Sequence, residues 1–91
     1  MKQYSFETLE VWQDSKEFAV KIYKITSAFP PEEKFGLISQ IRRAAVSVCS
    51  NIAEGNSKRS AKDKTNYIHI SYASTMELLN HIIIAHDLEM I

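Results

Sequence analysis

Basic side chains are concentrated in the middle of this 91-residue chain, although 11 Lys and Arg balance 11 Asp and Glu overall. Residues 42–64 carry only two acidic residues, Glu54 and Asp63, against six basic ones. The six are Arg42, Arg43, Lys58, Arg59, Lys62 and Lys64. Such a cluster can neutralise phosphates and release counterions, which makes nucleic-acid binding sensitive to salt. A solvated connection with ordinary helix-end charges is the alternative, because loops are commonly charged.

A strip of polar residues overlaps this cluster at intervals of three and four residues. It consists of Gln40, Arg43, Ser47, Asn51 and Glu54. This spacing places all five on one face of a helix. Because they include no set of nucleophile, base and orienting group, the strip favours hydrogen-bonded contacts over catalysis. We expect Ser47, Asn51 and Glu54 to serve structural or subunit contacts.

Histidine and cysteine do not follow a metal-site pattern. His69, His81 and His86 are 12 and 5 residues apart, whereas two ligands on one helix need to lie about one turn apart. Glu77 and His81 do have that spacing, but it is more typical of a surface pair. The single Cys49 excludes an internal disulfide, and we expect a buried, unreactive thiol. The sequence thus predicts no metal, no cofactor and no catalytic residue.

Two enzymatic patterns are also missing from the sequence. Small helical RNases of the HEPN-like type carry an Arg followed a few residues later by a His, and none of Arg42, Arg43 and Arg59 has a His there. The two glycines, Gly36 and Gly55, are too few for a glycine-rich phosphate loop. We therefore expect a protein that is not an enzyme.

Three amphipathic segments must position these side chains. Residues 9–28 are expected to form the first helix, because their inward positions recur every three or four residues. These positions, with Phe29 just beyond, are Val11, Ser15, Phe18, Ile22, Ile25 and Phe29. Pro30 and Pro31 end this helix, since proline cannot continue it.

The second helix is expected to start at Pro31, with Glu32 and Glu33 beside the positive end of its dipole. Its inward positions are Ile38, Ile41, Ala45, Val48 and Ile52. Gly55 suits the left-handed position that follows a helix C-terminus.

The third helix is expected to begin at Ser60, an N-cap residue with Asp63 three positions later. Two apolar stripes lie side by side along it. The first is Ile68, Ser71, Thr75, Leu78, Ile82 and Ala85, and the second is Tyr72, Met76, Leu79 and Ile83. A helix that is apolar on several sides needs burial on several sides. Because the sequence ends at Ile91, we expect another chain to cover this helix.

These elements predict an all-α fold, with residues 1–91 as a single domain. The domain is an antiparallel, up-down bundle of three long helices in which a fourth helix is missing or truncated. Its open apolar face predicts a homo-oligomer. No apolar run approaches the roughly 18–20 residues of a membrane span, and the N-terminus lacks the apolar core of a signal peptide. We therefore expect a cytoplasmic protein.

Four motifs in order along the chain carry a resemblance to a known family. They are Leu9-Glu10-Val11-Trp12-Gln13, Phe35-Gly36-Leu37, Gln40-Ile41-Arg42-Arg43-Ala44-Ala45 and Ser50-Asn51-Ile52-Ala53-Glu54-Gly55. From about Leu9 to Ile91 the chain resembles the bacterial four-helix-bundle proteins encoded in intervening sequences of large-subunit ribosomal RNA genes. The resemblance implies a ring-like homo-pentamer with no established enzymatic activity. Accessory variability proteins of retroelements look similar in fold, and they bind a reverse transcriptase and nucleic acid through a basic surface.

The polar positions that match the family are Arg42, Arg43, Ser47, Asn51 and Glu54, and the resemblance implies packing between helices or subunits for them. The sequence departs from the family in two ways. The family usually continues into a fourth helix, whereas this sequence stops where that helix would begin. The family also commonly has Glu-Leu-Glu in the third helix, where this sequence has Glu77-Leu78-Leu79.

Two hypotheses of function follow, and they belong to different classes. In the first, the protein is an oligomeric scaffold that binds RNA, DNA or a nucleic-acid-handling enzyme. Its phosphate contacts are Lys58, Arg59, Lys62 and Lys64, with Arg42 or Arg43 added from the second helix. In the second, it is a protein–protein adaptor whose apolar face captures a partner helix. That face consists of Leu78, Leu79, Ile82, Ile83 and Ile84.

Overall fold

Three long helices make up most of the protein. The computed structural model describes residues 4–33 and 36–91, and Phe35 of one sequence motif lies outside these ranges. The helices are α1 (Glu10–Thr26), α2 (Leu37–Ser57) and α3 (Ala61–Asp87), and two short 3-10 helices, η1 (Ser5–Thr8) and η2 (Pro31–Glu33), precede α1 and α2. The all-α prediction is confirmed.

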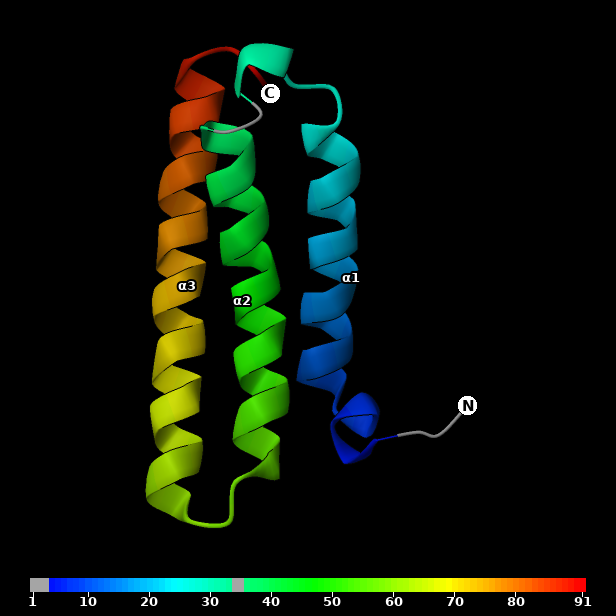
Figure 1. Ribbon diagram of the computed structural model, residues 1–91, viewed down its shortest axis with the longest axis vertical. Coiled ribbons are helices and arrows are strands. Elements are labelled where there is room, and N and C mark those ends of the chain that lie inside the picture. Colours follow the sequence, from blue (N-terminus) through cyan, green and yellow to red (C-terminus); the bar gives the residue numbers. More distant parts are fainter. Residues whose placement is uncertain (1–3, 34–35) are drawn as a thin grey trace.

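The helices run up, down and up, and α2 packs against both of its neighbours (Figure 1). Within the described ranges no Cα atom of α1 lies within 8 Å of a Cα atom of α3. The bundle therefore has three of the four positions of a four-helix bundle, and the side between α1 and α3 is open. No helix in the described part of the chain combines the length and hydropathy needed to cross a bilayer.

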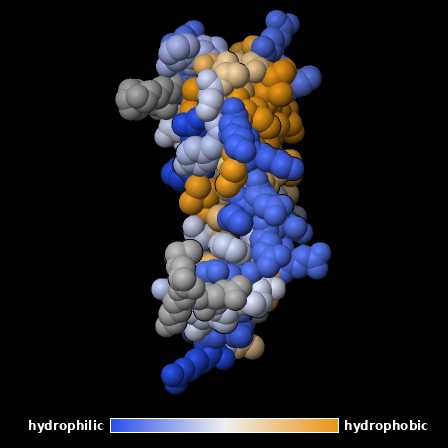
Figure 2. All heavy atoms as spheres, turned by 90° about the vertical axis from the view of Figure 1, so that its right-hand side faces the viewer, coloured by the Kyte–Doolittle hydropathy of each residue, from blue (hydrophilic) through white to orange (hydrophobic). Residues whose placement is uncertain are grey.

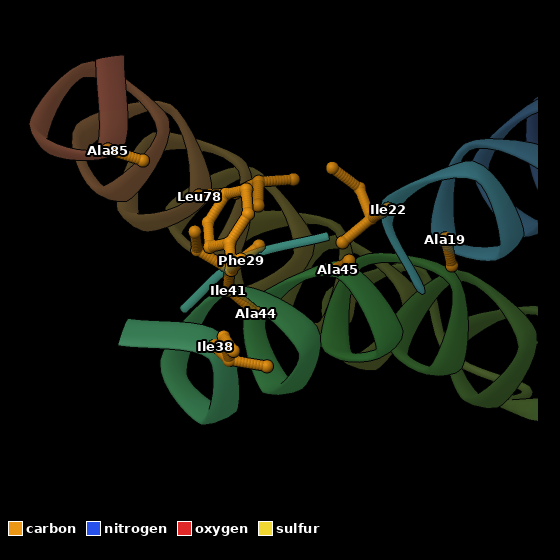
Figure 3. Packing of buried hydrophobic residues seen from close by; sticks show 9 residues of the cluster. All are labelled: Ala19, Ile22, Phe29, Ile38, Ile41, Ala44, Ala45, Leu78 and Ala85. Atoms are coloured by element: carbon orange, nitrogen blue, oxygen red, sulfur yellow. The ribbon is translucent and has the colours of Figure 1, made fainter. Parts of the chain in front are cut away.

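The buried core lies in the half of the bundle where α1 ends and α2 begins. It consists of Ala19, Ile22, Phe29, Ile38, Ile41, Ala44, Ala45, Leu78 and Ala85. Figure 3 shows Phe29, from the connection after α1, among side chains of α2 and α3. Toward the other end α2 and α3 are joined by hydrogen-bonded serines and by the close approach of Gly55 to Tyr67, so the apolar core covers only part of the length of the bundle.

The predicted inward face of α1 is only partly correct. Ile22 and Phe29 are buried, but Val11, Phe18 and Ile25 are 59%, 46% and 47% exposed. Helix α1 is rotated so that Ala19 and Thr26 face α2 instead. This rotation buries the Thr26 hydroxyl, which donates to the Ile22 carbonyl at 2.7 Å and accepts a hydrogen bond from α2.

Two predicted helix boundaries are wrong. Helix α2 begins at Leu37, and Pro31 belongs to the separate η2 turn. The Glu33 carboxylate nevertheless accepts a hydrogen bond from the Leu37 N–H at 3.3 Å, so an acid still lies at the start of α2. Gly55 lies inside α2, and no described glycine has a positive φ. A Cβ at Gly55 would lie 2.9 Å from the Tyr67 Cβ, so this glycine allows close approach of α3.

The C-terminal end of α3 supplies the left-handed residue instead. Glu89 has a φ of 62°. The Met90 N–H donates to the Ala85 carbonyl and the Glu89 N–H donates to the His86 carbonyl, both at 2.9 Å. This pair of bonds is a Schellman motif, which satisfies carbonyls at the helix end. It turns Met90 back against the core.

Candidate functional site

The connection between α2 and α3 presents four cations within seven residues. We call Lys58, Arg59, Lys62 and Lys64 the basic turn. Only residues 58–60 separate the two helices. The Ser60 Oγ accepts a hydrogen bond from the Asp63 N–H at 3.1 Å, which caps α3 as the sequence predicted. The cap fixes the backbone that carries the four cations.

The charges of the basic turn are available to a ligand. In the described part of the chain, none of the four cations forms an ion pair with a carboxylate. Arg59, Lys62 and Lys64 are exposed, and Lys58 is half-buried with its Nζ 5.1 Å from the centre of the Tyr67 ring. Asp63 lies in the first turn of α3, where its charge complements the helix dipole.

Arg42 lies near the other end of α2 and joins it to α1. Its Nε donates to the Thr26 Oγ1 at 2.8 Å, and its Nη2 donates to the Tyr23 carbonyl at 3.2 Å and to the Ser27 Oγ at 3.5 Å. Its guanidinium also lies 4.6 Å from the centre of the Tyr23 ring. At 1.5 Å of rise per residue, Arg42 and Lys58 are about 24 Å apart along α2. The structure does not bring Arg42 to the basic turn.

Arg43 is also engaged within the chain. Its Nη2 donates to the Gln40 Oε1 at 2.7 Å and to the Glu77 Oε1 of α3 at 3.0 Å. The same Glu77 oxygen lies 3.4 Å from the His81 Nε2, while the His81 Nδ1 is buried without a partner. The spacing of Glu77 and His81 predicted their pair. Arg43 is 34 residues from Glu77, and no sequence spacing indicated that contact.

Part of the polar strip of α2 lies in its contact with α3. The hydroxyls of Ser47 and Ser74 are 2.8 Å apart, and the Ser71 hydroxyl donates to the Val48 carbonyl at 2.9 Å. Asn51 donates to the carbonyl and the hydroxyl of Ser47. Ser47 therefore joins α2 to α3, whereas the hydrogen bonds of Asn51 stay within α2. Glu54, in contrast, is exposed.

A groove of about 740 Å³ opens between α1 and α3. Val11 and Phe18 line one wall, and Ile68 and Tyr72 line the other. Val48 and Ile52 of α2 form part of its floor, with Lys64 and Asp14 on opposite walls. Figure 2, viewed from the α1 side, shows apolar surface gathered toward the end of the molecule where α1 ends, whereas the groove lies toward the end where α1 begins.

The open apolar face predicted on α3 is present but differs in its members. Leu79, Ile83 and Ile84 are exposed, whereas Leu78 is only 3% exposed and Ile82 is half-buried. Leu78 faces α2 because Ser71, Ser74 and Ala85, at helical spacing from it, form the buried side of α3. The exposed face therefore lies beside the stripe that packs on α2.

Metal-binding and nucleophilic groups are not clustered in the described residues. No three His, Cys, Asp or Glu side chains there lie close enough together to hold a metal ion. Cys49 is half-buried, and its Sγ donates to the Val46 carbonyl at 3.3 Å. Burial raises the pKa of the Cys49 thiol, which disfavours the reactive thiolate.

Comparison with known proteins adds one finding. A family model described as 23S rRNA-intervening sequence protein matches residues 7–91. No curated protein matches the chain. The family match covers all three helices and the basic turn, in agreement with the resemblance carried by the sequence motifs.

Proposed function

The chain belongs to the 23S rRNA-intervening sequence protein family, and we propose that it is a non-enzymatic, oligomeric helical scaffold of the cytoplasm that binds nucleic acid. The family description refers to a place in a ribosomal RNA gene and to no reaction. The proposal therefore depends on the basic turn, where Lys58, Arg59, Lys62 and Lys64 contact the phosphates of RNA or DNA. A nucleic-acid-handling enzyme that carries its substrate to this surface is compatible with the same contacts.

The observation that carries this proposal is the lack of carboxylate partners for these four cations in the described residues. A cation already paired with a carboxylate would have to exchange that partner for a phosphate. The cations of the basic turn need no such exchange, and the Ser60 cap holds their backbone in place. Binding therefore requires little rearrangement of the chain.

The expected interaction is electrostatic and does not depend on base sequence, because phosphate contacts position a protein without specifying a site. Four phosphate contacts predict a slope of log affinity against log salt of about −3.6 for duplex DNA and about −2.8 for single strands. An oligomer repeats the basic turn, so its slope will be steeper than that of one chain.

The test is a fluorescence anisotropy titration with structured RNA and with duplex DNA at several salt concentrations. We expect micromolar or tighter binding that weakens steeply with salt. Replacing all four residues, Lys58, Arg59, Lys62 and Lys64, with Ala should lower the affinity at least tenfold and flatten the salt dependence, while the circular dichroism of the helices stays unchanged. Equal affinity and slope in this variant would remove the basic turn from the function.

A charge-matched control separates the turn from general electrostatics. Lys16, Lys21 and Lys24 are exposed on α1, and replacing them with Ala removes the same charge as replacing Lys58, Lys62 and Lys64. The α1 variant should bind nearly as well as the unchanged protein. If both triple variants lose the same affinity, net charge rather than the basic turn governs binding.

The groove between α1 and α3 favours a second candidate function, that of a protein–protein adaptor. An apolar groove between two helices fits the apolar face of a partner helix. Replacing Asp14, which lines this groove, with Lys or with Ala should disturb an adaptor and leave phosphate binding intact. A loss of nucleic-acid binding in those variants would show that this charge change does not separate an adaptor from a phosphate-binding scaffold.

A further inference from the structure

Three aromatic rings gather outside the buried core, where the chain enters α1. The rings of Tyr4 and Phe6 stack with their centres 5.8 Å apart and an angle of 7° between their planes. The Phe6 ring meets the Trp12 ring edge-on at 4.9 Å. Phe6 and Trp12 are half-buried, and Tyr4 is 54% exposed. We call Tyr4, Phe6 and Trp12 the aromatic shelf.

The aromatic shelf lies at the same end of the bundle as the basic turn (Figure 1). The Asn56 Nδ2 donates to the Ser5 Oγ at 3.0 Å, which joins η1 to the last turn of α2. Ser5 stands between the two stacked aromatic residues in the sequence. Asn56 precedes Lys58 by two residues, so their Cα atoms are at most about 7 Å apart. One short ligand can therefore reach both the rings and the cations.

Hydrogen bonds fix the aromatic shelf before any ligand binds. The Gln13 Nε2 donates to the Glu7 carbonyl at 2.7 Å, which ties η1 to the first turns of α1. The bond from Asn56 ties η1 to α2. Because the Trp12 ring belongs to α1, it supports the stacked pair from the bundle. A surface that is ordered in advance lowers the entropic cost of binding a ligand.

The aromatic shelf is separate from the groove between α1 and α3. Among the described residues that line the groove, none belongs to the shelf, and only Lys64 belongs to the basic turn. The rings are also outside the apolar core. Exposed aromatic rings beside cations without carboxylate partners are the combination that proteins use to bind single strands, with bases on the rings and phosphates on the cations.

We propose that the ligand of the basic turn is a single-stranded nucleic acid, DNA or RNA, whose bases stack on the aromatic shelf. This inference rests on the proposed function and names the class of nucleic acid. Every base has a flat π-face, so stacking on the shelf needs no particular sequence. The bases of a duplex are already stacked on one another, whereas those of a single strand can turn out to meet an aromatic side chain.

The first measurement compares the affinities of three DNA probes of about 12 nucleotides, within the usual size of single-strand sites. They are a thymidine strand, an abasic strand with the same phosphates and no bases, and a duplex. We expect the thymidine strand to bind at least about fivefold more tightly than the abasic strand, because each stacked base adds affinity. It should also bind more tightly than the duplex.

The outcomes separate this inference from the proposed function. Equal affinity for the thymidine and abasic strands, or tighter binding of the duplex, would overturn the stacking and leave the basic turn in place. Binding of none of the probes at low salt would overturn the proposed function and this inference with it. If the thymidine strand keeps its full affinity when Lys58, Arg59, Lys62 and Lys64 are all Ala, the basic turn fails alone.

A uridine strand of the same length compares RNA with DNA. It should bind within about threefold of the thymidine strand, because base faces and phosphates are common to both. A preference of more than about tenfold for either strand would contradict a contact limited to base faces and phosphates.

Replacing Tyr4 tests the shelf directly. Tyr4→Leu keeps an apolar side chain but has no ring, so it should weaken binding of the thymidine strand about fivefold and of the abasic strand less than about twofold. Tyr4→Phe should bind both strands as the unchanged protein does. Tyr72→Leu is the matched control, because Tyr72 is 65% exposed on α3 and lies outside the shelf. An equal loss for both strands, or an equal effect of Tyr72→Leu, would contradict stacking at the shelf.

A fluorescent reporter locates the bases. In a Trp12→Phe background, Tyr4→Trp places the single indole of the chain at the outer ring of the shelf. Its fluorescence should fall when the thymidine strand binds and stay unchanged when the abasic strand binds. Tyr72→Trp in the same background should respond to neither strand. The same quenching at both positions, or none at position 4, would overturn the inference.

Discussion

Arg42 and Arg43 differ from the cations of the basic turn in what their charges contact. Arg42 donates hydrogen bonds to α1, and Arg43 pairs with Glu77 of α3. The four cations of the turn have no carboxylate partner in the described residues. All six belong to one basic segment in the sequence, yet two of them join helices through hydrogen bonds and four have no such partner on another helix.

The type of cation agrees with this division. A guanidinium has several donors in a fixed plane, so Arg42 can reach a hydroxyl and a carbonyl of α1 at once. Three of the four cations in the basic turn are lysines, whose flexible ammonium groups bind phosphate as point charges. The count of positive charges therefore does not measure the size of a phosphate-binding surface. The internal partners of each cation must be known first.

Replacing Arg42 should give the largest loss of stability and little loss of nucleic-acid affinity. Arg42→Ala removes hydrogen bonds to Thr26 and Tyr23 and leaves the Thr26 hydroxyl, in a residue only 1% exposed, with one acceptor lone pair unfilled. We expect the free energy of unfolding to fall by about 2 kcal/mol in urea denaturation. Because Arg42 lies about 24 Å from Lys58, beyond a Debye length of roughly 8 Å, nucleic-acid affinity should change less than about twofold.

Two variants control for the loss of the side chain of Arg42. Arg42→Lys keeps the charge but cannot form the same set of bonds, so it should recover less than half of the lost stability. Thr26→Val removes the acceptor of the Arg42 Nε, and its effect should not add to that of Arg42→Ala. Additive losses of stability, or a large drop in the nucleic-acid affinity of Arg42→Ala, would contradict the distinction between Arg42 and Arg43 on one side and the basic turn on the other.

Gly55→Ala should have the next largest effect, because it acts on the contact that positions the basic turn. The added Cβ would lie 2.9 Å from the Tyr67 Cβ, so α3 must shift at its first turns. Overpacking costs about 1–3 kcal/mol, and the higher helix propensity of Ala returns up to about 1 kcal/mol. We expect a net loss of about 1–2 kcal/mol in thermal or urea unfolding, together with weaker nucleic-acid binding. A more stable variant with unchanged binding would show that the contact between Gly55 and Tyr67 is not tight.

The helices and their order were predictable from the sequence, because apolar spacing and the Ser60 cap are local signals. The side of α1 that is buried was not. Val11, Phe18 and Ile25 continue the apolar arc of Ile22, and spacing alone does not tell which part of such an arc meets a neighbour. The observed orientation includes the hydrogen bond from Arg42 to Thr26, and these residues are 16 positions apart.

The basic turn was predictable as a cluster, but its separation from Arg42 and Arg43 was not. Charge counting along the sequence treats residues 42–64 as one segment, whereas residues 42–57 of that segment extend along α2 for about 24 Å. The exposed stripe of α3 was predictable from its spacing. Only the structure shows that Leu78 belongs to the buried side and that α1 leaves the groove open.

Arg43→Ala gives the smallest expected effect and the sharpest test of the comparison. Arg43 contacts a carboxylate, as a structural cation should, but its side chain is 65% exposed and that of Glu77 is 39% exposed. Solvent screens such a pair, so its loss should cost no more than about 0.5 kcal/mol in the free energy of unfolding. Glu77→Gln should cost a similar amount in the same urea denaturation, since Gln retains an acceptor oxygen for Arg43 and His81.

The binding result for Arg43→Ala then decides which set Arg43 belongs to. If its pairing with Glu77 keeps it from phosphate, the salt dependence of nucleic-acid binding should stay the same in this variant. If instead the slope of log affinity against log salt becomes shallower by about 0.9, the value for one phosphate contact with duplex DNA, Arg43 exchanges Glu77 for a phosphate. A cation with a weak internal partner can then serve both purposes. In that case exposure of the ion pair, rather than its presence, separates structural cations from binding ones.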